Sequence, residues 1–571
     1  MKRRMKIPPI SHLIYQSTSN LSTKVFYAIS LSISLLFVTT LFPINFFTGS
    51  NPFWYDVRTD PTQHVTGLWA FLLDQWQFPL LYTHFLNAPE GINAAYADII
   101  PLAALIYKPL ANFFPEHSHY FGWWDFGTFL LQGFAGAFLL GKLVRYSLLC
   151  SITGSLLALY MPSFLIRIAH TALMTQGLIL LAIAFYFLTV RNKNMHWIHM
   201  LLIPLFLSAT IHPYLLAMIY PIYLITLLSY AFQQQKWTYF FLHSSITTFI
   251  IGFILWAIGY YSASGDIFKP THGFDVNSMN LLSPFLGTHL VQNFFISNQF
   301  IQLDATGLQI DGHNYLGLST LFLMIYLLIF HPREIYYSIK KHFLFTFLLI
   351  GFTFYSLSNT IYLSDHRLLH YDLPHFIQPL TGTFRSSGRF FWPVGYTLVF
   401  GSFLLFINIY KNRQWFIPIL LLLVTIQVID LSPHRAFLDE ASHRKTYFKY
   451  DFQIMNNLIS KHQNVYLFPT YKCGSDYTDP LAFQFFSTYN KKPFNTGFIA
   501  RAGGHCEEKE KILLNKPQSG AIYFFSQNHR EKSYTQKVSK FISQCSKRLQ
   551  YNSLTICFSN GSVANTPPHS Q

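Results

Sequence analysis

Residues 24–47 read KVFYAISLSISLLFVTTLFPINFF, an almost unbroken apolar run. A helix that crosses a bilayer needs about 20 apolar residues, so this run is long enough to span a membrane. Basic residues flank it at Lys2, Arg3, Arg4, Lys6 and Lys24. The polar stretch that follows carries acidic residues, a histidine and tryptophans: Asp56, Asp60, His64, Asp74, Glu90, Asp98, Trp54, Trp69 and Trp76. This order predicts a membrane protein whose first loop outside the cytoplasm bears carboxylates.

The composition of the whole chain supports the same class. Of its 571 residues, 51% are hydrophobic, 18% are aromatic and only 11% are charged, whereas soluble domains contain roughly 25% charged residues. The net charge of +16 does not indicate a nucleic-acid partner, because the Lys and Arg residues stand in short clusters between apolar runs. Such clusters are typical of the loops that orient an integral membrane protein.

Eleven apolar runs approach or reach the length of a membrane span. They cover residues 24–47, 121–141, 147–166, 171–190, 197–212, 213–232, 238–260, 314–331, 343–362, 392–410 and 414–432. A twelfth run, 99–114, is shorter and contains Pro101, Lys108 and Pro109. We interpret it as a re-entrant or interfacial helix.

The basic loops favour eleven spans over twelve. With 99–114 not crossing, nearly every short basic loop falls on the side of the N-terminus: Lys142 and Arg145, Arg191 and Lys193, Lys236, Arg333 with Lys340 and Lys341, and Lys411 with Arg413. The positive-inside bias makes that side cytoplasmic and places the C-terminus outside. The run 24–47 is too long for a signal-peptide core and lacks a small-residue cleavage site, so we expect it to be retained.

These spans predict a polytopic α-helical membrane protein in three parts. Residues 1–23 form a cytoplasmic N-terminus, and residues 24–432 form a transmembrane domain with long outer loops at 48–120, 261–313 and 363–391. Residues 433–571 form a small extracytoplasmic α/β domain. Strand-like runs occur there at 465–469, 522–526 and 554–558, with helical stretches near 447–461 and 533–546. Residues 559–571 are polar and are expected to fray.

Four of the five cysteines lie after the last predicted span, at Cys473, Cys506, Cys545 and Cys557. An even set of cysteines in a compact segment favours disulfides, which persist outside the cytoplasm. Sequence proximity favours the pairs Cys473–Cys506 and Cys545–Cys557, and two other pairings remain open. Cys150 stands inside a predicted span and is expected to be a packing residue.

The first candidate site is acidic. Asp56, Asp60 and His64 follow one another at intervals of four residues, so a helix would present them on one face. Such a group could bind a divalent cation or act as a base towards a hydroxyl group. Asp98 precedes the short apolar run and could stand at the mouth of a cavity at membrane level. For Asp60, which precedes Pro61, and for Asp98, the alternative is a helix N-cap.

The second candidate site is basic. Arg385 and Arg389 flank Ser386 and Ser387 just before the tenth span, and two forked guanidinium groups could clamp a phosphate. Arg167 and His170 stand at another outer helix end and could also bind a lipid phosphate. Anchoring at the interface is the alternative role for these arginines.

Further polar residues at outer helix ends could line the same cavity: His212, Asp311 and His313. For His212 a buried structural role is the stronger alternative. The spacings of a tight zinc site are absent from the sequence. There is also no GxxxxGK[ST] loop and no long cytoplasmic loop, which argues against a pump driven by its own ATPase.

Taken together, these motifs resemble a known group of proteins. The long acidic first loop, the many spans, the basic outer loops and the extracytoplasmic C-terminal domain resemble the GT-C superfamily of polyprenyl-phosphate-sugar-dependent glycosyltransferases. The segments Asp60-Pro61-x2-His64, Asp98-Ile-Ile-Pro, Asp311-Gly-His-Asn-Tyr-Leu-Gly and Phe384-Arg-x-Ser-Gly-Arg-Phe-x-Trp-Pro resemble a bacterial multi-pass membrane family usually grouped with it. The resemblance covers most of residues 25–560. Thr59 departs from the pattern, because a glycine is expected before the Asp-Pro pair.

The resemblance implies a reaction and a location. A sugar on a polyprenyl phosphate would be the donor, and an envelope glycan, lipid or protein would be the acceptor, on the outer face of the inner membrane. Asp60, or else Asp56 or Asp98, would act beside the acceptor, and Arg385 and Arg389 would neutralise the lipid phosphate. We expect these groups to share one cavity. The competing interpretations are a lipid-linked glycan polymerase or ligase, a flippase or transporter, and a non-catalytic envelope assembly factor.

Overall fold

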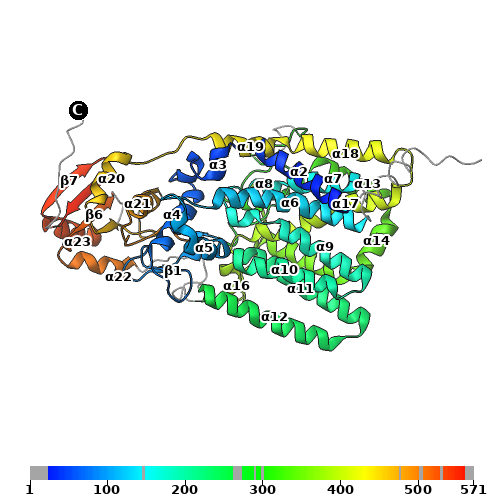
Figure 1. Cartoon of the computed structure of the whole chain (residues 1–571), viewed down its shortest axis with the longest axis horizontal. Helices are drawn as coiled ribbons and strands as arrows, with labels where there is room; N and C mark the ends of the chain where they lie inside the picture. Colours follow the sequence, from blue (N-terminus) through cyan, green and yellow to red (C-terminus); the bar gives the residue numbers. More distant parts are fainter. Residues whose placement is uncertain are drawn as a thin grey trace, which may run out of the picture. The chain divides into compact units, whose positions relative to one another are not determined.

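A computed structural model describes residues 23–144, 148–261, 273–288, 291–296, 301–474, 478–500, 506–526 and 532–559. Most of these residues are helical (Figure 1). Residues 1–22 of the predicted cytoplasmic segment 1–23, the basic loop residue Arg145 and residues 560–571 of the predicted frayed end 559–571 lie outside the described residues. The chain forms two compact units. Unit 1 comprises Met1–Phe47, Trp123–Gly252 and Phe268–Ser442, and unit 2 comprises Thr48–Gly122, Phe253–Ile267 and His443–Gln571.

Unit 1 is built from helices, most of which are apolar. They are α2 (Thr23–Thr39), α3 (Ile44–Thr48), α6 (Phe121–Leu143), α7 (Leu148–Leu159), α8 (Pro162–Leu165), α9 (Gly177–Asn192), α10 (His196–Ile211), α11 (Pro213–Gln234), α12 (Trp237–Ile258), α13 (Leu318–Phe330), α14 (Pro332–Lys341), α15 (Phe343–Leu357), α16 (Gln378–Thr383), α17 (Trp392–Tyr410), α18 (Phe416–Asp430) and α19 (Ser432–His443). Helix α9 packs against α10 and α11, and α13 packs against α17 and α18.

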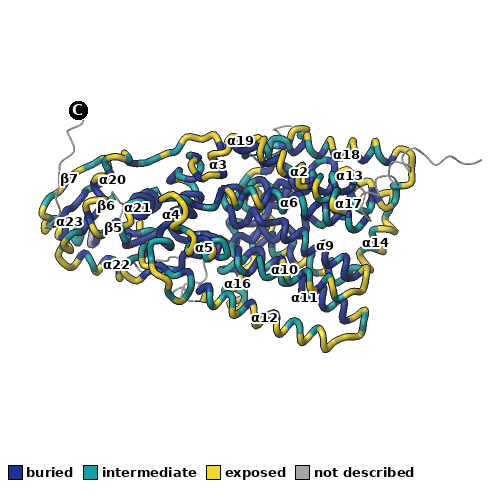
Figure 2. Tube along the Cα trace, in the orientation of Figure 1, coloured by how far each residue is buried: buried dark blue, intermediate teal, exposed yellow. Residues whose placement is uncertain are grey.

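Small residues allow two of these helices to approach closely. A Cβ atom added at Gly136 of α6 would lie 2.2 Å from the carbonyl oxygen of Gly154 on α7, and the reverse holds for Gly154. Only glycine permits such an approach of two backbones, a packing mode that is common between helices in membranes. Among the candidate spans, burial is strongest on α9, and the central helices of unit 1 contain many buried, dark blue segments in Figure 2.

The apolar helices are consistent with a helical membrane protein. Among the described residues, five helices are long and apolar enough to cross a bilayer, and up to eight do so if each of three bent helix pairs forms one span. Three shorter apolar helices are α7, α10 and α15. Each predicted span overlaps one apolar helix, although the number of eleven crossings stays a prediction. The segment 99–114 forms the short helix α5 (Pro101–Tyr107) and the 3₁₀ helix η3 (Lys108–Phe113), which together are shorter than a span requires.

Unit 2 contains the predicted α/β fold of the C-terminal segment. Its four-stranded sheet has the order β5 (Asn464–Phe468), β6 (Ala521–Ser526), β8 (Leu554–Phe558) and β7 (Lys547–Tyr551). Strands β5 and β6 are parallel, whereas β8 runs antiparallel to both of its neighbours. The helices of this segment are α20 (Phe452–Ser460), α21 (Thr478–Tyr489), α22 (Cys506–Glu510) and α23 (Lys532–Ser543). The three predicted strands and both predicted helices are confirmed, and β7, α21 and α22 are additional.

Both predicted disulfides are present in unit 2. Cys473 pairs with Cys506 and Cys545 pairs with Cys557, with Cα–Cα distances of 5.5 and 5.6 Å. Cys150 is free and buried, as expected for a packing residue. The pairing by sequence proximity is therefore confirmed.

The first long loop folds together with the C-terminal segment in unit 2. Helix α4 (Asp60–Leu73) of the loop packs against α21, where the Gln484 side chain donates a hydrogen bond to Thr66 Oγ1 at 2.7 Å. The Phe494 amide donates to the Phe85 carbonyl at 3.0 Å. The sequence had assigned this loop to the transmembrane domain, but its contacts place it in unit 2.

Two short strand pairs and several 3₁₀ helices complete the described part of the fold. Within unit 2 these are η1 (Pro52–Tyr55), η2 (Ala94–Ala97), η8 (Lys511–Leu514) and the antiparallel pair β1 (Tyr82–Thr83) and β2 (Ile92–Asn93). Within unit 1 they are η4 (Thr171–Met174), η6 (Gln309–Gly312), η7 (Ser387–Phe391) and the antiparallel pair β3 (Thr360–Leu363) and β4 (His366–His370). The segments η6 and η7 carry the charged residues of the candidate site.

Candidate functional site

Two arginine side chains of unit 1 converge on one carboxylate. Arg389 in η7 donates from Nη2 to both carboxylate oxygens of Asp311 in η6, at 3.1 and 3.0 Å. Arg167, which follows α8, donates to Asp311 Oδ1 and, from Nη2, to the Ile310 carbonyl at 2.8 Å. Three predicted site residues that are far apart in the sequence thus form one ion cluster, which we call the arginine cluster.

The arginine cluster is almost entirely removed from solvent. Arg167 is 3% exposed and Arg389 is 8% exposed. Burial by itself would raise the pKa of Asp311, but the charges of Arg389 and Arg167, with a further contribution from His170, hold that pKa below its ordinary value. Asp311 is therefore ionised at neutral pH. A buried carboxylate stays ionised only when groups of opposite charge lie beside it, as the two arginines do here.

Two glycines bring the segments of the arginine cluster together. A Cβ atom added at Gly388 would lie 2.4 Å from the Cα atom of Gly312. The Asn314 side chain bridges the same two segments, donating from Nδ2 to the carbonyl oxygens of Gly312 at 2.9 Å and Gly388 at 3.0 Å. The glycines of the Asp311-Gly and Gly-Arg389 motifs are thus needed for close backbone approach, and this approach sets Asp311 opposite Arg389.

Helix α11 supplies an aromatic wall for Arg389. The guanidinium carbon of Arg389 lies 4.9 Å from the centre of the Tyr214 ring, a cation–π distance. The Tyr214 hydroxyl accepts a hydrogen bond from the Ser386 amide at 2.8 Å. His212 caps α11, since its Nδ1 accepts from the Tyr214 amide at 3.1 Å. The geometry thus gives His212 the structural role that was the stronger alternative for it.

Arg385 does not join the arginine cluster. Its aliphatic carbons lie beside Gly273, where an added Cβ atom would be 3.4 Å from Arg385 Cδ. No ion pair or hydrogen bond of Arg385 occurs within the described part of the chain. The guanidinium that meets Arg389 at Asp311 belongs to Arg167 instead. The spacing of four residues was a poor guide here, because η7 begins between the two arginines and is a 3₁₀ segment, not an α-helix.

His313 pairs with a histidine that the sequence did not single out. His313 Nε2 lies 3.0 Å from His434 Nε2, and the two rings stack with their centres 5.3 Å apart. Burial lowers the pKa of His313 to about 3, with a smaller contribution from Arg167. Nearby in the sequence, Asp430 accepts from the Tyr315 hydroxyl at 2.7 Å. The only sequence feature that points to His434 is its position just beyond the last predicted span.

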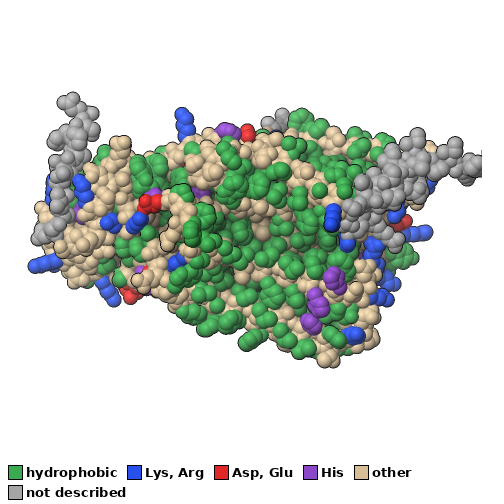
Figure 3. All heavy atoms as spheres, viewed as in Figure 1, with side chains coloured by type: hydrophobic (Ala, Val, Ile, Leu, Met, Phe, Trp, Pro, Cys, Tyr) green, Lys and Arg blue, Asp and Glu red, His purple; other side chains and the backbone are tan. Residues whose placement is uncertain are grey.

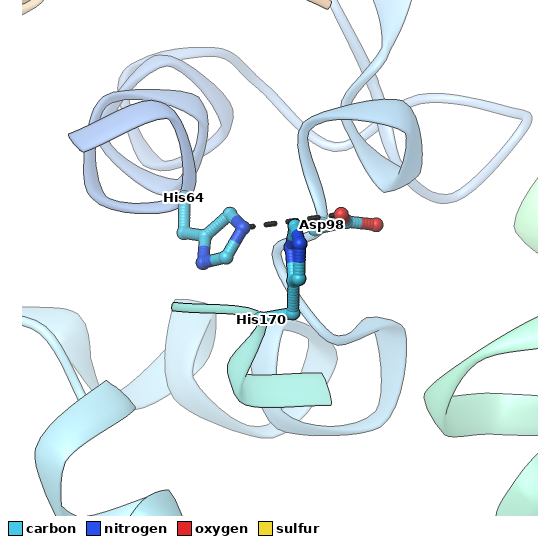
Figure 4. Close-up of side chains that lie close together, drawn as sticks. All are labelled: His64, Asp98 and His170. Atoms are coloured by element: carbon cyan, nitrogen blue, oxygen red, sulfur yellow. Dashed lines mark ion pairs between the residues drawn. The ribbon is translucent and has the colours of Figure 1, made fainter. Parts of the chain in front are cut away.

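The acidic candidate site lies in unit 2 and is built on α4 (Figure 4). His64 on α4 is buried, and its Nε2 lies 3.8 Å from Asp98 Oδ2 at the end of η2. Gly67 permits this approach, because a Cβ atom there would lie 2.5 Å from Ala97 Cβ. The sequence therefore predicted both members of this His64–Asp98 pair. His170, also drawn in Figure 4, belongs to unit 1.

Neither carboxylate of this site serves as the helix N-cap that was its alternative. The N-cap of α4 is Thr59, and Asp60 is the first helical residue, one turn before His64. The N-cap of α5 is Ile100, while Asp98 ends η2 in the left-handed conformation at φ 55°. A non-glycine residue in that conformation is uncommon, and Asp is among the residues that tolerate it best.

Asp56 is engaged by a neighbouring arginine. Its carboxylate accepts from Arg58 Nε at 2.9 Å and from Arg58 Nη2 at 2.6 Å. Arg58 thus occupies the oxygens that a divalent cation shared with Asp60 would need. His64 and Asp98 offer one nitrogen and one oxygen ligand, which is fewer than the three or four protein ligands of typical zinc sites. The His64–Asp98 pair of unit 2 is therefore better suited to proton transfer than to binding a cation.

Comparison with known proteins assigns the chain to a family. Residues 31–432 match the family described as "Domain of unknown function (DUF6311)", and residues 454–542 match its "DUF6311 C-terminal domain". The chain belongs to the DUF6311 family. A search of curated proteins finds no match. In this DUF6311 protein, the arginine cluster and the His64–Asp98 pair both fall within the part that the first family description covers.

Proposed function

We propose that this DUF6311 protein is a membrane glycosyltransferase. It would move a sugar from a polyprenyl-phosphate donor to an envelope glycan, lipid or protein on the outer face of the bacterial inner membrane. One observation carries the proposal: Nε of Arg167 is buried and has no hydrogen-bond acceptor among the described residues, although its two neighbouring Nη atoms are engaged. A buried donor without an acceptor is costly, and a phosphate oxygen would satisfy it.

The arginine cluster would bind the donor phosphate and stabilise its departure. Negative charge grows on the phosphate when the bond between its oxygen and the anomeric carbon breaks. Guanidinium groups that are already fixed in place stabilise such charge without reorganising. Asp311 would hold Arg167 and Arg389 in that position, and the Tyr214 ring would restrict Arg389 further.

The acidic residues of unit 2 would act on the acceptor. The acceptor hydroxyl oxygen forms the new bond to the anomeric carbon, and its proton must pass to a base. Asp60 and the His64–Asp98 pair supply a carboxylate and an imidazole for this transfer, which are common general bases. A lipid-linked donor would also require no nucleotide outside the cell.

The outer location is supported by two features of the chain. The apolar helices are typical of membrane insertion, and the two disulfides of unit 2 favour an oxidising compartment. The positive-inside bias of the basic loops supports an outer location for the C-terminal segment as well.

The acceptor role can be tested with Asp60→Asn. This change keeps the size of the side chain and removes its charge, so a base or charged ligand is lost while the fold is retained. In nanodiscs supplied with polyprenyl-phosphate hexoses and an envelope extract as acceptor, we expect glycosyl transfer to fall about a hundredfold. Asp372→Asn, at a fully exposed carboxylate outside both candidate sites, is the control and should keep wild-type transfer. Equal transfer by all three proteins would contradict the role of Asp60.

A further inference from the structure

Helix α14 is a short basic helix that connects two apolar helices. It begins directly after α13, turning by 99°, and α15 follows at Phe343. None of its ten residues is buried. Figure 2 accordingly shows α14 as an exposed element, unlike the dark central helices of unit 1.

The two faces of α14 differ in chemistry. At 3.6 residues per turn, Ile335, Tyr336 and Ile339 share one face, and Lys341 lies opposite it beside Glu334. Arg333 and Lys340 flank the apolar face on the side of Tyr336, next to Tyr337. The apolar face is exposed, since Tyr336 is 59% and Ile339 is 47% exposed. Lys and Arg side chains gather around this end of unit 1 in Figure 3. An exposed apolar face rimmed by charged residues marks a surface that contacts a protein or a membrane.

Two histidines fix the ends of α14 to candidate membrane spans. At its start, His331 Nε2 lies 2.6 Å from the Tyr410 hydroxyl at the end of α17. At its end, His342 Nδ1 lies 3.1 Å from the Tyr186 hydroxyl on α9. Lys411 follows Tyr410 directly and adds positive charge at the same place. The helix is therefore held at the ends of the spans.

The exposed apolar face of α14 continues onto both neighbouring helices. Ile329 and Phe330 at the end of α13 are exposed, and so are Phe343 and Phe347 at the start of α15. On the apolar helices of a membrane protein, exposed side chains of this kind face lipid. The same lipid surface thus reaches the apolar face of α14, whose charged face is then turned to the headgroups and water.

We propose that α14 lies in the plane of the bilayer surface and binds anionic phospholipid headgroups. Its apolar face would enter the boundary between headgroups and acyl chains, as amphipathic helices do, and its lysines would contact lipid phosphates. This inference does not depend on the proposed glycosyltransferase activity.

Spin labels on the two faces of α14 test its position. Single cysteines at Ile339→Cys and Lys341→Cys, in full-length protein carrying Cys150→Ser, are labelled and reconstituted into vesicles that contain phosphatidylglycerol. We expect the label at position 339 to collide mainly with oxygen, which concentrates in lipid, and the label at position 341 to collide mainly with a water-soluble nickel complex. Equal access of nickel to both labels would overturn the proposal. Protection of position 339 from both reagents would also overturn it, because a protein partner would then cover that face.

The requirement for anionic lipid is tested separately. In detergent, we expect Lys340→Gln/Lys341→Gln to weaken the binding of a fluorescent phosphatidylglycerol by about fivefold for each lysine lost. The matched control is Lys193→Gln, an exposed lysine beyond the end of α9. Binding that is unchanged in the double variant, or equally tight for phosphatidylcholine, would overturn the headgroup assignment.

Discussion

Asp311 is the side chain on which the arginine cluster depends. It accepts hydrogen bonds from both Arg167 and Arg389, which are themselves buried. Removing its charge would leave two buried guanidinium groups without this counterion, a change that typically costs about 3–5 kcal/mol. Sequence motifs identified all three residues, but only their contacts showed that Arg167, and not Arg385, accompanies Arg389.

Arg389 belongs to the arginine cluster and Arg385 does not, so the same substitution at the two positions should have different effects on phosphate binding. Lysine keeps the charge of arginine but loses the forked donors. We expect Arg389→Lys to weaken the binding of a polyprenyl phosphate by about tenfold or more, which corresponds to the loss of one hydrogen bond to a charged group. Arg385→Lys should change the affinity by less, because Arg385 lies outside the cluster. Titration of the purified variants in detergent measures both, and a larger loss in Arg385→Lys would contradict the assignment.

The buried pair of His313 and His434 predicts a pH dependence of stability. The pKa of His313 is lowered to about 3 in the fold, whereas an unfolded histidine titrates near 6.5. The unfolded chain therefore binds more protons between these values, so stability is complete above about pH 6.5 and falls as the pH decreases towards 3. The melting temperature in detergent should decrease from pH 7 to pH 4.5. In His313→Gln this decrease should be smaller, and an unchanged slope would contradict the role of the pair.

At the scale of elements, short segments at the ends of long helices carry the chemistry. The segments η6 and η7 hold Asp311 and Arg389, and η2 holds Asp98 against α4. Apolar periodicity and length predicted the long helices, because those helices are specified by runs of local sequence. The pairing of η6 with η7 could not be predicted in this way, since it rests on contacts between residues about 75 positions apart.

The contact of η6 with η7 predicts a large effect of a single methyl group. Gly388→Ala would place a Cβ atom 2.4 Å from Gly312 Cα, so the two segments must separate. We expect this variant to lose about 1–3 kcal/mol of stability, as overpacked cores do. Gly401→Ala on α17 is the control, because nothing lies within 4 Å of its added Cβ atom. Thermal unfolding in detergent compares the two, and equal melting temperatures would contradict the close approach.

At the scale of the molecule, unit 2 combines three separate stretches of the chain. They are residues 48–122, 253–267 and 443–571, which fold together although apolar helices separate them in sequence. The acidic loop therefore packs against the folded C-terminal segment. Helix α4 contacts α21, and the Glu116 carboxylate forms an ion pair with Lys491 at 2.5 Å. Helix α4, which carries His64, is therefore packed on both the first loop and the C-terminal segment.

The predicted orientation of the chain can be tested directly. Alkaline phosphatase folds only where disulfides form, so its fusion after Ser559 should be active if the C-terminal segment is outside the cytoplasm. A fusion after Lys193, in a basic loop, is the control and should be inactive. The reverse pattern would overturn the topology. Alkylation of protein that is unfolded but not reduced should modify only Cys150, because the other four cysteines are paired.

The sequence by itself determined the features that depend on local composition. Apolar runs specified the helices, β-rich runs specified β5, β6 and β8, and proximity specified the disulfides Cys473–Cys506 and Cys545–Cys557. Only the tertiary structure decided which polar side chains meet. Arg167 with Asp311, His313 with His434 and α4 with α21 are contacts across more than 100 residues. No periodicity encodes such contacts, because the packing of distant helices and loops sets them.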